Sequence, residues 1–339
     1  MVTPLSTTFP TLLDLARRLD PEGKIARVAE ILNQYNELLD DMAWVEGNLP
    51  TGHKTTVRSG IPQATWRLLN QGVAPIKSST NQITDTCGML EAYSEVDKDL
   101  ALLNGQSAAW RESEDKPILE GMNQQLAEAL VYGDTSVNPE RFVGLAPRYY
   151  SVAGSATSPN IIDAGGTGSD NTSIWLIGWS PETIHGIFPK GSIAGLQMRD
   201  LGEHTIYDSA NGRLQAFRTH FQLKAGLTVR DWRYVVRIAN IDISDLETAG
   251  DASDTSANLF KLMSKALDLF PPVGNVRPVF YMNNRVRAML RVKLISKSNL
   301  WLSLNDMQGA SGITRPTLSF QGVPCKRVDA ITVAEARIV

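Results

Sequence analysis

Hydrophobic residues recur at steps of three and four in several stretches of the chain, which is the spacing of a helix with one buried face. The longest of these stretches lies between residues 108 and 132. Its apolar face consists of Leu119, Met122, Leu126, Ala129 and Leu130. Gly133 follows directly, in the position where glycine commonly ends a helix. The pattern predicts a long helix over 108–132, with a kink or a restart at Pro117.

The beginning of the chain predicts an arm followed by a helix. Residues 1–20 contain two prolines and a cluster of Ser and Thr. Asp20-Pro21-Glu22 then supplies an N-cap and a proline at the first helical position, and apolar spacing continues to Met42. The apolar face of this helix packs either on the subunit's own core or on a neighbouring subunit, and the pattern leaves both open.

Helices and strands alternate in the second half. One helix is predicted over 259–270, where Pro271 stops it, and another begins at a cap from Asn283 or Asn284. The strand predictions are a buried strand at 174–179, a half-buried strand at 217–223, an extended run at 227–243 and β-like sequence from 317 to 339. This mixture indicates an α+β fold.

Residues 47–82 differ from the rest. Glycines and prolines interrupt short β-prone runs at 54–58 and 64–69, and the apolar content is too low for a core sheet. The segment therefore predicts a long, exposed, two-stranded excursion. Since an isolated hairpin is only marginally stable in water, it needs a surface to lie on.

This excursion is basic. Its cations are Lys54, Arg58, Arg67 and Lys77. They serve either to keep the segment soluble or to pair with acidic groups on a partner. The acids available for such pairing on the predicted long helix include Glu112, Glu114, Asp115 and Glu120.

Composition narrows the class of protein. The 339 residues suffice for about two domains, and 42% hydrophobic residues indicate a folded chain. The net charge of −3 is too small to attract nucleic acid or an anionic membrane. Only two cysteines, Cys87 and Cys325, are present, so we expect a reducing compartment and no disulfide. The sequence shows neither a signal-peptide pattern nor an apolar run long enough to span a membrane.

Candidate catalytic motifs are weak. Gly178-Trp179-Ser180-Pro181-Glu182 follows a predicted strand as a nucleophile elbow would, but Glu182 replaces the second glycine. Gly165-Gly166-Thr167-Gly168 is glycine-rich, yet no Lys-Ser/Thr follows it as in a phosphate-binding loop. The four histidines have no metal-ligand spacing, so we expect no metal and no cofactor. A cytoplasmic hydrolase or nucleotide-binding enzyme that uses Ser180 or the 165–168 loop is the alternative hypothesis.

Four stretches in a particular order resemble a known family. They are 64–79 with the strand that leads to Val96, 120–133 with Gly144-Leu145 after it, 278–283 with an arginine-rich helix, and 320–325 with Asp329 after it. In this order they resemble the major capsid proteins of tailed bacteriophages, the HK97-like family. Within the family, the likeness is to capsid subunits of short-tailed phages of the Bordetella type.

The resemblance implies an HK97-like α+β fold. Its parts would be an N-terminal arm and helix (1–46), an extended loop (47–82), a peripheral domain with a long spine helix (83–144), an axial domain (145–300) and C-terminal strands returning to the peripheral domain (301–339). The segment predicted as an exposed excursion would be this extended loop. By the architecture of the family, such a loop lies on the spine helix of a neighbouring subunit.

The resemblance also implies a function without catalysis. The chain would assemble with itself into hexamers and pentamers of an icosahedral shell that encloses phage double-stranded DNA. It would be made in the host cytoplasm and end in the virion. Further partners would be a portal protein, a separate scaffolding protein, a decoration protein and, by weak non-specific contact, the packaged DNA. The residues expected between subunits are Lys54, Arg58, Trp66, Arg67, Lys77, Glu112, Glu114, Asp115 and Glu120.

Overall fold

A computed structural model describes residues 10, 34, 36–103, 107–207, 211–248, 258–272, 276–296, 302–308 and 314–339. Most of the predicted arm and first helix within 1–46 lies outside these residues. Among the described residues, one compact unit contains Met89–Ala127 and Ile193–Lys224. The other contains Asn36–Gly88, Glu128–Ser192 and Ala225–Val339. We describe the two units separately, as the first and the second unit.

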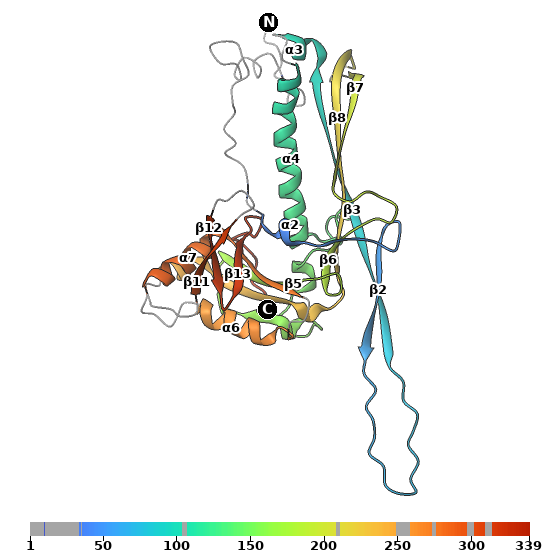
Figure 1. Ribbon diagram of the computed structural model, residues 1–339, viewed down its shortest axis with the longest axis vertical. Helices are drawn as coiled ribbons and strands as arrows, with labels where there is room; N and C mark the ends of the chain where they lie inside the picture. The colour runs from blue at the N-terminus through green and yellow to red at the C-terminus, as the bar shows by residue number, and fades with distance from the viewer. Residues whose placement is uncertain are drawn as a thin grey trace. The chain divides into compact units, whose positions relative to one another are not determined.

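The first unit combines a helix with a twisted ribbon of strands (Figure 1). Its elements are the later part of β3 (Ser79–Asp97), α3 (Lys98–Leu102), most of α4 (Ser107–Tyr132), β7 (Leu196–Tyr207) and the first part of β8 (Arg213–Val229). β7 pairs antiparallel with β8, which also neighbours β3. Thr219, Phe221 and Leu223 are buried, which confirms the predicted half-buried strand.

Helix α4 confirms the predicted long helix but not a restart. It runs from Ser107 to Tyr132 as one helix with Pro117 inside it. Pro117 is exposed, so its ring faces solvent. The buried face formed by Trp110, Met122 and Leu126 holds the helix on both sides of the missing hydrogen bond.

Gly133 ends α4 for a steric reason. Its N–H donates to the carbonyl of Ala129 at 2.9 Å. A Cβ at this position would lie 2.4 Å from the carbonyl oxygen of Phe142, so no side chain fits without moving the backbone.

A central sheet forms the second unit. Strand β5 (Asn171–Trp179) is buried along its whole length, and it pairs antiparallel with β9 (Val235–Asp242) and β10 (Arg277–Met282). Beyond β10 follow β13 (Val323–Arg327), β12 (Thr314–Phe320) and β11 (Leu302–Gln308). Short β4 (Ile161–Asp163) pairs with β9. The predicted buried strand at 174–179 is therefore confirmed.

The extended run predicted over 227–243 is wrong as one strand. β8 ends at Val229, a short 3-10 turn covers Trp232–Tyr234, and β9 begins at Val235. The carboxylate of Asp231 accepts a hydrogen bond from the N–H of Arg233 at 3.1 Å, which stabilises the turn between the two strands.

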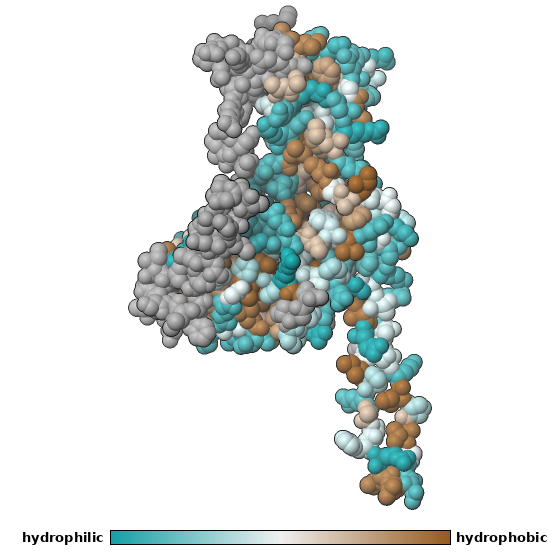
Figure 2. Space-filling model, in the orientation of Figure 1, coloured by the Kyte–Doolittle hydropathy of each residue, from teal (hydrophilic) through white to brown (hydrophobic). Residues whose placement is uncertain are grey.

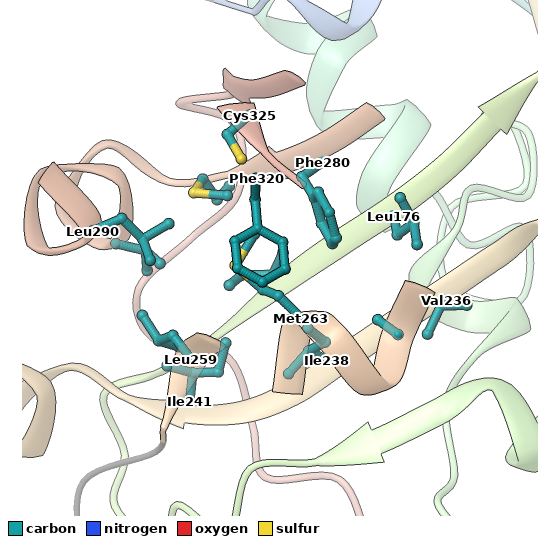
Figure 3. Packing of buried hydrophobic residues seen from close by; sticks show 14 of the residues in the cluster. Leu176, Val236, Ile238, Ile241, Leu259, Met263, Phe280, Leu290, Phe320 and Cys325 are labelled. Atoms are coloured by element: carbon teal, nitrogen blue, oxygen red, sulfur yellow. The ribbon is translucent and has the colours of Figure 1, made fainter. Parts of the chain in front are cut away.

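Three helices accompany this sheet: α5 (Ile243–Thr248), α6 (Leu259–Leu269) and α7 (Asn284–Ser296). The helix at 259–270 and its stop before Pro271 are confirmed. The side chain of Asn283 accepts from the N–H of Arg285 at 3.0 Å, which confirms a cap at the start of α7. Figure 3 shows the core that these elements enclose, with Met263, Phe280 and Phe320 at its centre.

The second unit also contains strand β2 of a long hairpin and several short elements. They are α2 (Leu38–Asp41), β1 (Trp44–Glu46), β2 (Gly52–Gly60), β6 (Ile184–Phe188) and short 3-10 turns at Ala146–Arg148 and Ser158–Asn160. β1 pairs parallel with β6. The described end of the predicted first helix is helical only over Leu38–Asp41, because Met42 is already extended.

A buried ion pair fastens the C-terminal segment to this unit. Nη2 of Arg237 lies 2.8 Å from Oε2 of Glu335, and each side chain is 5% exposed. Arg237 also donates to the hydroxyl of Ser173 at 3.0 Å, and its guanidinium lies 4.8 Å from the centre of the Trp175 ring. Glu335 accepts further hydrogen bonds from the hydroxyls of Tyr132 and Ser173. The pair therefore joins β9, β5, the end of α4 and the C-terminal segment.

Glu335→Ala should destabilise the protein strongly, because it leaves the Arg237 guanidinium buried without its carboxylate. We expect a loss of about 3–5 kcal/mol in the free energy of unfolding, measured by denaturant titration. The control is Glu128→Ala, which breaks a half-exposed pair with Arg141 and should cost about 1 kcal/mol or less. Equal midpoints for the two variants would contradict the role given to the buried pair.

Candidate interaction surface

The β2–β3 hairpin is the most unusual feature of the second unit. The two strands pair antiparallel from Gly52 opposite Thr86 to Gly60 opposite Ser79. Residues 61–78 then connect them without helix or strand, drawn in Figure 1 as an open loop beyond the strand ends. Loops of this length are uncommon in compact domains and are mostly functional. We call residues 61–78 the hairpin tip.

The predicted two-stranded excursion is thus confirmed, with one correction. The second strand begins at Ser79, and the β-prone run at 64–69 is not a strand. A β-prone sequence forms a strand only where another backbone lies within hydrogen-bonding reach, and the two sides of the tip do not pair.

The hairpin tip exposes large hydrophobic side chains. Trp66 is 100% exposed, Leu69 89% and Ile61 85%. Leu68, Val73 and Ile76 are exposed as well. Figure 2 shows hydrophobic residues interleaved with polar ones along this projection. Exposed apolar groups gathered on one segment indicate a surface that another molecule covers.

The predicted basic residues lie along the same hairpin. Lys54, Arg58, Arg67 and Lys77 are all exposed. Arg67 donates to the carbonyl of Gln71 at 3.3 Å. Within the described part of the chain, none of the four forms an ion pair. Their charges are therefore available to a partner.

The predicted acidic residues lie on α4 in the first unit, with unequal exposure. Glu112 is exposed and pairs with Lys116, one turn away, at 3.0 Å. Glu114 is half-buried. Glu120 is half-buried, and its Oε1 accepts from the N–H of Gln34 and from the side-chain amide of Gln124, both at 2.9 Å.

Asp115 differs from these three because it is only 7% exposed. Burial raises the pKa of its carboxyl, and the hydroxyl of Ser94 and the guanidinium of Arg111 partly oppose this shift. A buried carboxyl of this kind cannot meet a cation on another subunit unless the helix moves. Helical spacing alone did not distinguish Asp115 from its exposed neighbours.

Ser180 is not placed as a nucleophile. It is 8% exposed and begins a tight turn, in which its carbonyl accepts from the N–H of Thr183 at 3.1 Å. The next element is strand β6, whereas a nucleophile elbow leads into a helix.

The 165–168 loop is unsuited to phosphate. A Cβ on Gly168 would lie 2.7 Å from carboxylate oxygens of both Asp170 and Asp242, so acids line this part of the loop. Nearby carboxylates repel an anion. Neither motif therefore builds a catalytic site.

We next consider metal ligands, membrane-spanning helices and the two cysteines. Among the described residues, no three His, Cys, Asp or Glu side chains gather as metal ligands, and no helix is long and apolar enough to cross a bilayer. Cys87 and Cys325 are free thiols. Burial raises the pKa of Cys87 to about 11 and that of Cys325 to about 12, so both are protonated at neutral pH.

Sequence reasoning named only Trp66 among the apolar side chains of the tip. Ile61, Leu68, Leu69 and Ile76 show neither helical nor strand periodicity. Their number was too small to indicate a core. Their exposure together on one unsupported segment is the signal, and it needs the three-dimensional structure.

Comparison with known proteins gives consistent results. A model of the family described as major capsid protein GP7 matches residues 20–339. A chain in the near-atomic structure of bacteriophage epsilon15 is 37% identical, with 99% of each chain covered and a TM-score of 0.75. The capsid of bacteriophage JBD30 is 9% identical, covering 97% of this chain and 99% of that chain, with a TM-score of 0.47. No curated protein matches the sequence.

The family model and the epsilon15 chain each match nearly the whole chain, and together with the observed elements they confirm the expected HK97-like α+β fold. A major capsid protein is a structural component of the virion and not an enzyme, so the hydrolase or nucleotide-binding hypothesis is unsupported. The chain belongs to the major capsid protein GP7 family and is a major capsid protein of a tailed phage.

Proposed function

We propose that this capsid protein assembles into hexamers and pentamers of an icosahedral shell around double-stranded DNA, and that the β2–β3 hairpin holds each subunit to the next. The observation that carries the proposal is the hairpin tip, which leaves Trp66, Leu69 and Ile61 in solvent. From Asp85 toward the tip, the side chains of β3 (79–84) are all exposed, whereas those of β2 alternate between exposed and partly or fully buried. The tip and the adjoining part of β3 therefore have little support from their own subunit.

The energies favour a neighbour as that support. Burial of one large apolar side chain stabilises by about 1.5–3 kcal/mol. The tip carries six exposed large apolar side chains on residues 61–78, but the entropy cost of ordering its backbone on a neighbour offsets much of their gain. Each contact is therefore weak alone. In a closed shell the contact repeats in every subunit, and multivalency makes the assembly stable.

Charge complementarity supports the same arrangement. We propose that Lys54, Arg58, Arg67 and Lys77 face Glu112, Glu114 and Glu120 on α4 of a neighbouring subunit. Asp115 is excluded by its burial. Glu112 would exchange its local partner Lys116 for a cation of the hairpin. Exposed pairs are worth about 0.2–1 kcal/mol each, so they set the register of the hairpin more than its affinity.

Further parts of the proposal rest on the family resemblance alone. The division into arm, extended loop, peripheral domain, axial domain and C-terminal strands follows the ranges given above. The partners are a portal protein, a separate scaffolding protein, a decoration protein and weakly bound DNA, with assembly in the host cytoplasm. The likeness to capsid subunits of short-tailed phages of the Bordetella type also stays a prediction.

Replacing Trp66 and Leu69 together by Ala should impair shell formation and leave the subunit folded, because both side chains are fully or mostly exposed. Electron microscopy and sedimentation should show soluble subunits or capsomers in place of megadalton particles. The matched control is Val137→Ala, another exposed apolar residue of the second unit, outside the hairpin. Normal shells from the double variant would refute the proposed role of the tip.

Arg58→Glu should weaken assembly, and more so at low salt, because salt screens exposed charges. Adding Glu112→Arg to the same chain should restore assembly if these two residues pair between subunits. Lys190→Glu, an exposed reversal outside the hairpin, is the control for net charge. If Arg58→Glu assembles normally at low salt, the basic residues serve solubility only.

A further inference from the structure

Four strands meet where the hairpin joins the second unit, in the order β6-β8-β3-β2. The ring of His53 on β2 nevertheless lies 6.0 Å from the ring of His185 on β6, in an edge-to-face arrangement. Two strands separate β2 from β6 in the sheet, so the sheet curls here and brings both rings onto its inner side. We call residues 52–57 and 83–88 the hairpin root.

Other polar side chains lie on the same inner side. Asp85 is directly opposite His53, and Thr228 is directly opposite His185, so each pair shares a face of the sheet. His185, Asp85 and Thr228 are all buried, with His185 only 1% exposed. Buried polar groups of the hairpin root, β6 and β8 therefore lie together at this junction.

The acid at this site is already committed to a cation. Oδ1 of Asp85 lies 2.8 Å from Nη2 of Arg148. The same nitrogen donates to the carbonyls of Val143 and Leu227, which fixes Arg148 in place. Arg148 therefore neutralises part of the Asp85 charge, which weakens the support that Asp85 could give to a protonated histidine.

The remaining charged group that faces the rings is a second cation. Arg230, just after β8, disfavours protonation of both histidines. The thiol of Cys87, which also lies near Asp85, has its pKa raised to about 11 and is neutral. Among the described residues, the charged groups that act on the two rings are therefore Asp85, which is itself paired with Arg148, and Arg230.

His185 has the least support for a proton. Among the described residues, neither of its ring nitrogens has a hydrogen-bond partner of good geometry. Burial lowers its pKa to about 4, with smaller contributions from His53 and Arg230, and the Ser180 carbonyl only partly opposes this shift. Burial and Arg230 also lower the pKa of His53, against the opposing effect of Asp85. Both rings are neutral at pH 7.

We propose that the hairpin root is an acid-released joint, in which a proton on His185 is accommodated only when the root of β2 separates from β6. His185 is the sensor, because it is the more deeply buried ring. His53 strengthens the response, since a second imidazolium at this distance would repel the first. Separation exposes both rings to water and frees the hairpin to move relative to the rest of the second unit.

The direction of the pH effect follows from linkage. A histidine in water has a pKa of about 6.5, so the open root takes up a proton at a higher pH than the closed root. Above that pH neither state is protonated, so the histidines do not oppose the closed root. For each pH unit below it, down to about pH 4, the ratio of closed to open root falls by up to tenfold for His185 alone.

The test is amide hydrogen exchange of the full-length, unassembled protein at about pH 7 and about pH 5, corrected for the intrinsic pH dependence of exchange. The root can leave β6 only if the pairing of β3 with β8 opens, because these two strands lie between β2 and β6. We therefore expect the amides of residues 83–88 to lose protection by about tenfold or more at the lower pH. The amides of β5 and β9, in the same unit, should keep theirs. Unchanged protection of the root in the wild-type protein would overturn the proposal.

Two variants separate His185 from general acid effects. His185→Gln should remove the pH dependence at the root, whereas His204→Gln, a change at an exposed site on β7, should preserve it. If His185→Gln does not fold, His53→Gln replaces it and should make the response to acid shallower. The same loss of protection in a folded His185→Gln protein would show that another group is the sensor.

Discussion

A two-stranded ribbon with solvent on both faces cannot bury its own apolar side chains, and this constraint organises the function of the protein. Residues 61–78 carry six large apolar side chains that their own subunit leaves exposed. A chain that kept them in solvent would gain nothing from them and would risk aggregation. We therefore propose that the segment is half of a contact whose other half belongs to another copy of the same chain.

The rest of the second unit is built to carry such a projection. The buried strand β5 and the core around Phe280 and Phe320 form a rigid base. The Arg237–Glu335 pair closes that base by fastening the C-terminal segment to it. The hairpin root, by contrast, places the buried polar side chains of His185 and Asp85 beside the ring of His53, and we propose that its two histidines make it sensitive to pH. The core of the second unit would thus hold the hairpin in place, while the hairpin root would allow it to move.

Local sequence patterns predicted the elements whose ends and faces are set by neighbouring residues along the chain. The helix that ends at Gly133, the helix before Pro271, the cap at Asn283 and the excursion between 47 and 82 all follow from spacing and turn chemistry. The burial of Asp115 and the pairing of Arg237 with Glu335 could not be predicted in this way. They join segments far apart in sequence, and a single sequence carries no record of such contacts. For the same reason, the sequence predicted the basic residues of the hairpin, but their acidic partners on a neighbouring subunit stay a proposal.

The most direct measurement is hydroxyl-radical footprinting of Trp66, in unassembled subunits and in shells assembled from the purified protein alone. Trp66 is fully exposed in the single chain, so it should be oxidised rapidly in free subunits. In shells that contain no other protein, only a neighbouring copy can cover it. The account predicts a several-fold slower oxidation of Trp66 in the shell, while exposed Val137 and its surroundings keep their reactivity. Equal oxidation of Trp66 in both states would contradict the claim that a neighbouring subunit supports the hairpin.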